Sequence, residues 1–129
     1  MDRKTIRILV AEDDDFTRLL LIEFLDGAGY DTLAARDGSK ARHLIDDPDG
    51  IDVLVTDVNM PGSHGISVAR HLRELRPGVP VVFVTGQPEQ VEGRKLFAPF
   101  AQFPEHFNLS DLVESVSKML DTDTEPVPS

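Results

Sequence analysis

Acidic side chains follow two short apolar runs of this sequence, at the point where each run ends. Glu12 and Asp13 come directly after Ala11, and Asp57 comes directly after Thr56. Two carboxylates held about 4 Å apart repel each other by about 4 kcal/mol at an effective dielectric constant of about 20. A group of such carboxylates therefore either keeps a proton or binds a cation.

The donor atoms in these segments indicate which cation and which reaction to expect. All of them are oxygens, and the 129 residues include no cysteine. This set favours Mg²⁺, which binds through one or two carboxylates and keeps several waters. A carboxylate beside Mg²⁺ can attack phosphorus and form an acyl phosphate. Thr85, which ends a third apolar run, could hydrogen-bond a phosphoryl oxygen or simply cap a neighbouring residue.

Asp14 and Asp15 have a simpler interpretation than a role in this chemistry. They precede an apolar pattern of helical spacing between Phe16 and Leu25. Carboxylates are favourable at a helix N-terminus, because they accept hydrogen bonds from free backbone N–H groups and oppose the positive end of the helix dipole. We therefore expect these two residues to cap the N-terminus of the first helix or to add favourable negative charge there.

Predicted strands and helices alternate along the chain and place the acids together. The strands are apolar on both faces, as in a buried parallel sheet. An open α/β sheet has its functional crevice at the carboxyl ends of the strands, which is where the acids fall. Strands are predicted at 6–11, 30–35, 53–56, 79–85 and 98–103. Helices are predicted at 16–25, near 41–45, at 66–75, weakly at 87–97, and at 109–120 with Asn108 or Ser110 as the cap.

Composition limits the class of protein. The chain is 40% hydrophobic and carries 23 acidic against 13 basic residues, a net charge of −10. This balance argues against direct nucleic-acid binding, which requires a clustered basic surface. No apolar run approaches the roughly 20 residues that span a bilayer, and no signal peptide is evident, so we expect a cytoplasmic protein without membrane contact. We predict one domain over residues 1–120 and a disordered acidic, proline-containing tail over 121–129.

Three sequence blocks occur in a characteristic order. They are Ile-Leu-Val-Ala-Glu-Asp-Asp at 8–14, Asp-Val-Asn-Met-Pro-Gly at 57–62, and Val-Phe-Val-Thr-Gly at 82–86. Together they resemble the receiver domain of two-component response regulators, and the resemblance runs from about Ile6 to Leu120. It implies a flavodoxin-like (βα)5 fold, a doubly wound parallel sheet of five strands in the order 2-1-3-4-5.

The resemblance also implies roles for particular residues. Asp57 would accept a phosphoryl group from a sensor histidine kinase or phosphotransfer protein. Asp13 and Asp57 would bind Mg²⁺ through their side chains, Asn59 through its backbone carbonyl, and Glu12 through water. Thr85 would be the switch hydroxyl. The surface formed by the fourth helix, fifth strand and fifth helix of the (βα)5 fold would carry the signal to an unidentified protein target. The domain could also self-associate as a homodimer through this surface. It would not be an enzyme.

One segment departs from the receiver pattern. Receivers usually carry Lys-Pro-Phe after the fifth strand, and here Glu105-His106-Phe107 stands at that position. The alternative register, Ala98-Pro99-Phe100, also lacks lysine. A carboxylate beside a phosphoryl group would replace attraction by repulsion, unless Glu105 points away. We therefore predict that Asp57 can be phosphorylated but that the conformational response is weakened or altered.

Other functions remain open at this point. The missing lysine also suits a pseudo-receiver that acts as a protein-interaction module without phosphorylation. A haloacid dehalogenase-like phosphatase is less favoured, since such enzymes need a second aspartate two residues after the nucleophile, where this chain has Asn59. A flavodoxin-like cofactor binder is also less favoured, because the acids after the first strand would repel a phosphate.

Overall fold

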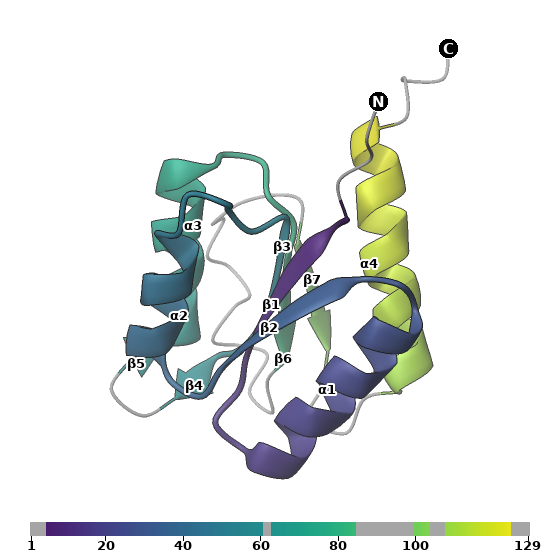
Figure 1. The fold of residues 1–129 in the computed structure, drawn as a ribbon, viewed down its shortest axis with the longest axis horizontal. Coiled ribbons are helices and arrows are strands. Elements are labelled where there is room, and N and C mark those ends of the chain that lie inside the picture. Colours follow the sequence, from purple (N-terminus) through teal and green to yellow (C-terminus); the bar gives the residue numbers. More distant parts are fainter. Residues whose placement is uncertain (1–4, 61–62, 85–99, 104–107, 125–129) are drawn as a thin grey trace.

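The computed structural model describes residues 5–60, 63–84, 100–103 and 108–124. Strands and helices alternate within these ranges, and one short hairpin interrupts the alternation (Figure 1). The elements are β1 (Arg7–Ala11), α1 (Asp15–Gly27), β2 (Asp31–Ala35), α2 (Gly38–Ile45), β3 (Val53–Asp57), β4 (Asn59–Met60), β5 (Ser63–His64), α3 (Gly65–Leu75), β6 (Val81–Val84), β7 (Phe100–Phe103) and α4 (Leu109–Thr124).

Five parallel strands form the central sheet, in the order β2-β1-β3-β6-β7. This is the predicted order 2-1-3-4-5, once the two-residue strands β4 and β5 are set apart as a separate antiparallel pair. Strand order reverses between β1 and β3, so the carboxyl ends of these two strands border the functional crevice of such a sheet. The predicted doubly wound α/β fold is confirmed.

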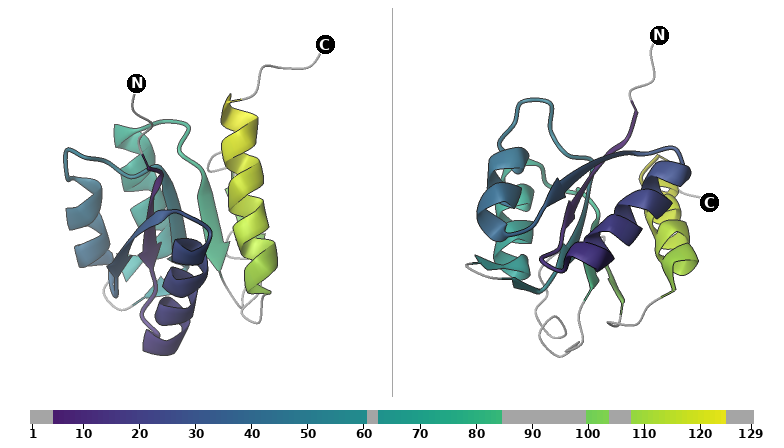
Figure 2. Two further views of the ribbon diagram at one scale, coloured as in Figure 1. Left: turned by 45° about the vertical axis from the view of Figure 1, so that its right-hand side comes forward. Right: turned by 60° about the horizontal axis from the view of Figure 1, so that its bottom comes forward.

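Helices cover both faces of the sheet. Two views show α2 and α3 on one side and α1 and α4 on the other (Figures 1 and 2). Leu9 and Ala11 of β1 are buried in the core beneath α2 and α3, whereas Ile8 and Val10 are buried in the core beneath α1 and α4. Because successive side chains of a strand point to opposite faces, a strand buried on both sides must be apolar at nearly every position.

Element boundaries differ from the sequence predictions at several ends. The strand predicted at 79–85 is described over Val81–Val84, and the backbone N–H of Val79 instead bonds to the carbonyl of Arg76. Helix α4 continues to Thr124, beyond the predicted end at Leu120, because the next helix-breaking residue in the sequence is Pro126. The predicted helix at 87–97 lies outside the described residues, as do 125–129 of the predicted tail.

The start of α4 agrees with one of the two expected caps. The side-chain Oδ1 of Asn108 accepts the backbone N–H of Asp111 at 3.2 Å. Asn108 is therefore the N-cap, and Ser110 lies within the first turn of the helix. Among the helices of the described ranges, none is long and apolar enough to span a membrane.

Candidate functional site

The acidic residues singled out in the sequence meet at the carboxyl edge of the sheet. Ala11 of β1 and Thr56 of β3 are paired in register, so the residues that follow them, Glu12 and Asp57, lie next to each other. One carboxylate oxygen from each of Glu12, Asp13 and Asp57 lies within 4.8 Å of the others. Chain segments 45 residues apart therefore supply one cluster of three carboxyl groups.

This cluster fits a small, hard cation. Ligand oxygens of an octahedral Mg²⁺ sit about 2.1 Å from the ion, and so about 3–4 Å from one another. The separation of up to 4.8 Å in the cluster requires only a small approach of the side chains. Asp13 is exposed and Asp57 is half-buried, so the site opens to solvent on one side. Water can therefore complete the coordination, as Mg²⁺ prefers.

Burial makes the charge of this cluster costly. Glu12 is 5% exposed, and this desolvation raises the pKa of its carboxyl to about 8, with Asp57 and Asp13 adding repulsion. Partly opposing this, the backbone N–H of Asp14 donates to Glu12 Oε2 at 3.1 Å. Glu12 therefore holds a proton near neutral pH when no cation is bound, as expected for a buried carboxyl beside other acids.

Asp57 is perturbed in the same direction but less strongly. Desolvation and the charge of Asp13 raise the pKa of Asp57 to about 6, against an opposing hydrogen bond from the backbone N–H of Asn59. That N–H lies 3.2 Å from Asp57 Oδ1. Asp57 is consequently the more readily ionised member of the Glu12–Asp57 pair, which is what a nucleophilic carboxylate requires.

Two residues that the sequence did not single out hold the backbone of Asp57. The hydroxyl of Thr56, fully buried, donates to the carbonyl oxygen of Asp57 at 2.9 Å. Gly65, at the start of α3, packs directly against the same peptide, and its N–H donates to the carbonyl of Val58 at 2.7 Å. A Cβ atom at Gly65 would lie 2.0 Å from the Asp57 carbonyl oxygen, so only glycine fits there.

The turn after β1 is held by its own set of contacts. Asp14 is the N-cap of α1, and its Oδ2 accepts the backbone N–H of Thr17 at 2.8 Å and its hydroxyl at 2.7 Å. Arg18 donates to the backbone carbonyl of Glu12 at 2.9 Å and pairs with Asp15 at 2.6 Å. Asp14 is thus confirmed as a helix cap, and Asp15 lies in the first turn of α1.

Two predicted site residues are only partly located. Asn59 lies in β4, two residues beyond Asp57, and its described contact with the site is through its N–H rather than its carbonyl. Val84 is paired in register with Asp57, and Thr85, the next residue, lies outside the described residues together with Glu105. The metal-ligand role of the Asn59 carbonyl and the switch role of Thr85 stay predictions.

Comparisons with known proteins identify the family. A model of the response regulator receiver domain matches residues 8–101. The chain is 35% identical over 117 residues to the response regulator receiver protein CpdR of Brucella abortus, covering 88% of this chain and 96% of that protein. A crystal structure of a response regulator receiver protein from Sinorhizobium medicae superposes with a TM-score of 0.85 at 27% identity, covering 92% and 96% of the two chains. The protein belongs to the response regulator receiver domain family.

Some relatives are longer than this chain. The uncharacterized transcriptional regulatory protein YrkP of Bacillus subtilis is 40% identical over 86 residues, which are 67% of this chain and 36% of YrkP. The chain thus spans only about a third of that relative's length.

Replacing Gly65 tests how tightly α3 fixes Asp57. We expect Gly65→Ala to lower the free energy of unfolding by about 2–4 kcal/mol, since the added methyl must displace backbone rather than a flexible side chain. Gly27→Ala is the matched control, because no atom lies within 4 Å of a Cβ built at Gly27. Urea unfolding of both variants measures the difference, and equal stabilities would contradict the close packing of Gly65 on Asp57.

The raised carboxyl pKa values predict how stability depends on pH without a divalent cation. Since the folded state keeps protons on Glu12 and Asp57 that the unfolded chain releases, the free energy of unfolding should fall as pH rises from about 5 to about 8. Asp57→Asn removes one charge and should be more stable than the parent by about 1–3 kcal/mol at about pH 8, with a shallower slope.

Denaturant unfolding in EDTA at several pH values measures this dependence. Asp31→Asn is the control, because Asp31 is exposed at the start of β2 and should leave the slope unchanged. An Asp57→Asn variant less stable than the parent across this pH range would show that the cluster is not repulsive.

Proposed function

We propose that this domain accepts a phosphoryl group on Asp57 with Mg²⁺ bound in the acidic cluster, and that it signals through protein contacts. The observation that carries the proposal is the convergence of Glu12, Asp13 and Asp57 within 4.8 Å at the carboxyl edge of the sheet. Membership of the receiver family supports it, since receiver domains are the partners of sensor histidine kinases and phosphotransfer proteins. The domain is the recipient of the phosphoryl group in this reaction, and we do not propose that it is an enzyme.

The proposed step needs a charged and fixed nucleophile. One carboxylate oxygen of Asp57 attacks phosphorus, the new P–O bond forms, and the bond to the donor's imidazole nitrogen breaks with its electron pair left on nitrogen. Thr56 and Gly65 hold the peptide of Asp57, and the Asn59 N–H holds Oδ1, so the nucleophile is oriented before the donor arrives. Bound Mg²⁺ supplies positive charge against the incoming phosphoryl oxygens.

Ionisation of the cluster links the metal to the nucleophile. Without a cation, burial raises the pKa of Asp57 to about 6 and that of Glu12 to about 8. A divalent cation beside the three carboxyl groups favours their charged forms and offsets the repulsion between them. Asp57 would therefore be most reactive in the state in which the cluster binds the metal.

The readout of phosphorylation is proposed to differ from that of ordinary receivers. Support comes from the sequence alone, since Glu105 stands where receivers usually carry the phosphate-binding lysine, and the family match ends at residue 101. Backbone amide shifts of Phe100–Phe103 measured with and without the phosphoryl group address this part. Small changes agree with an altered switch, whereas large changes spreading through β7 contradict it.

Intact-mass analysis tests whether Asp57 is the acceptor. Incubation with a small-molecule phosphodonor and Mg²⁺ should add the mass of one phosphoryl group, and EDTA should abolish the gain. Asp57→Asn should gain nothing, because an amide is not a nucleophile at this step. Asp31→Asn, an exposed aspartate outside the cluster, should be modified like the parent.

The same measurement decides against the alternative function. A pseudo-receiver that acts only as an interaction module has no need of the metal or of the acyl phosphate. The experiment is run under conditions in which an ordinary receiver is modified. If the parent protein then gains no mass, the result favours the pseudo-receiver over the phosphoacceptor.

A further inference from the structure

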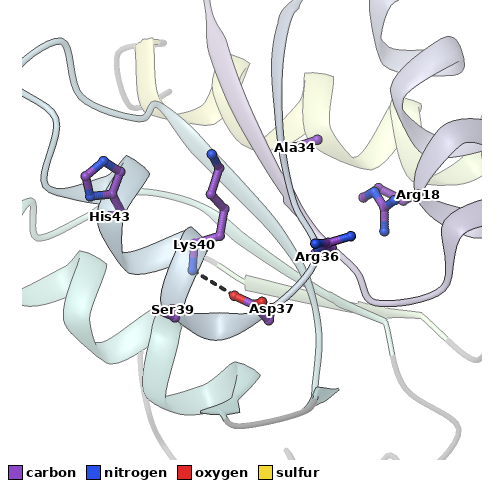
Figure 3. A pocket seen from close by; sticks show the side chains of 7 residues that line it. All are labelled: Arg18, Ala34, Arg36, Asp37, Ser39, Lys40 and His43. Atoms are coloured by element: carbon purple, nitrogen blue, oxygen red, sulfur yellow. Dashed lines mark hydrogen bonds between the residues drawn. The ribbon is translucent and has the colours of Figure 1, made fainter.

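A pocket separate from the acidic cluster lies at the β2 edge of the sheet. It has a volume of about 630 Å³ and is placed between α1, the carboxyl end of β2 and the first turns of α2 (Figure 3). The residues around it include Arg18 of α1, Arg36 and Asp37 after β2, and Lys40 and His43 of α2. Glu12, Asp13 and Asp57 do not line it, so the pocket is a separate feature of the surface.

The charge of this pocket is opposite to that of the chain. Three permanent cations, Arg18, Arg36 and Lys40, line it in a protein with 23 acidic and 13 basic residues. The one carboxylate in the lining, Asp37, is the N-cap of α2, and its Oδ1 accepts the backbone N–H of Lys40 at 2.8 Å. Asp37 is therefore engaged by the helix and neutralises only part of the surrounding positive charge.

Two of the three cations have no anionic partner in the described part of the chain. Arg18 pairs with Asp15, whereas the side chains of Arg36 and Lys40 make no hydrogen bond or ion pair with any described residue. In Figure 3, Arg36 lies between Asp37 and Arg18, and the carboxylate of Asp37 is turned toward the backbone N–H of Lys40. Arg36 and Lys40 therefore leave uncompensated positive charge at the pocket, and a bound anion would offset it.

The size and chemistry of the pocket indicate what kind of anion it takes. Small-molecule sites have volumes of about 300–1,000 Å³, and this pocket falls in that range. The planar fork of arginine binds phosphate oxygens in pairs, and the two cations without an ion pair, Arg36 and Lys40, favour an anionic group beside them. The Ser39 hydroxyl and the small, exposed Ala34 complete the lining and leave room beside the edge strand. We propose that this pocket binds a phosphate-bearing small molecule of about nucleotide size.

Titration with ADP, pyrophosphate and adenosine in EDTA tests this proposal. Without a divalent cation the acidic cluster repels anions, so binding there does not contribute. We expect ADP and pyrophosphate to shift the backbone amides of residues 34–43, and adenosine to leave them unchanged. The double variant Arg36→Gln, Lys40→Gln should bind ADP at least tenfold more weakly. Arg42→Gln, an exposed cation of the same helix outside the pocket lining, should bind as the parent does.

The comparison of probes also identifies the source of the phosphate. Equal affinities for pyrophosphate and ADP indicate a site for free phosphates, and a higher affinity for ADP indicates a nucleotide site. Absence of shifts at residues 34–43, or unchanged ADP binding by the double variant, would overturn the proposal. Asp57→Asn should bind ADP like the parent, so the failure of phosphorylation at Asp57 and the failure of this site are separate results.

Discussion

Burial of mutually repelling carboxyl groups at the edge of the sheet is the constraint on which the proposed function of this domain depends. Glu12, Asp13 and Asp57 present oxygens within 4.8 Å of one another, and Glu12 is 5% exposed. Desolvation raises the pKa of Glu12 to about 8, and repulsion from Asp57 and Asp13 adds to this shift, so a proton or a cation in the folded cluster is favoured. A site of this kind is destabilising for the fold by itself, and such unfavourable clusters are typical of functional sites.

The rest of the structure brings these charges together and keeps them in place. Parallel pairing of β1 with β3 sets Glu12 beside Asp57, and cores on both faces of the sheet hold the two strands in register. Gly65 then lets α3 approach the carbonyl of Asp57 more closely than any side chain would allow. The apolar interior thus supplies the stability that the acidic edge lacks, as in other sites that store unfavourable interactions.

Sequence patterns predicted the architecture and the convergence of the acidic residues for identifiable physical reasons. A strand buried on both faces must be apolar, and parallel strands must end at one edge, so the apolar run 53–56 already placed Asp57 at that edge. Close packing gave no such periodic signal. Nothing in the sequence around Gly65 indicates that the start of α3 lies against the Asp57 carbonyl, where an added Cβ would be only 2.0 Å from the oxygen. The basic pocket was missed for the same reason, because the rest of α1 and all of β2 separate Arg18 from Arg36 and Lys40 in the sequence. The end of α4 at Thr124 was missed because helical hydrogen bonding continues where the apolar pattern has stopped.

Thermal unfolding with and without Mg²⁺ tests the central claim most directly. A cation that offsets the repulsion among Glu12, Asp13 and Asp57 binds only the folded state, so saturating Mg²⁺ should raise the Tm of the parent protein by about 3–6 °C relative to EDTA. Asp57→Asn, with one carboxylate fewer, should respond much less. Identical melting curves in Mg²⁺ and EDTA for the parent protein would contradict the account.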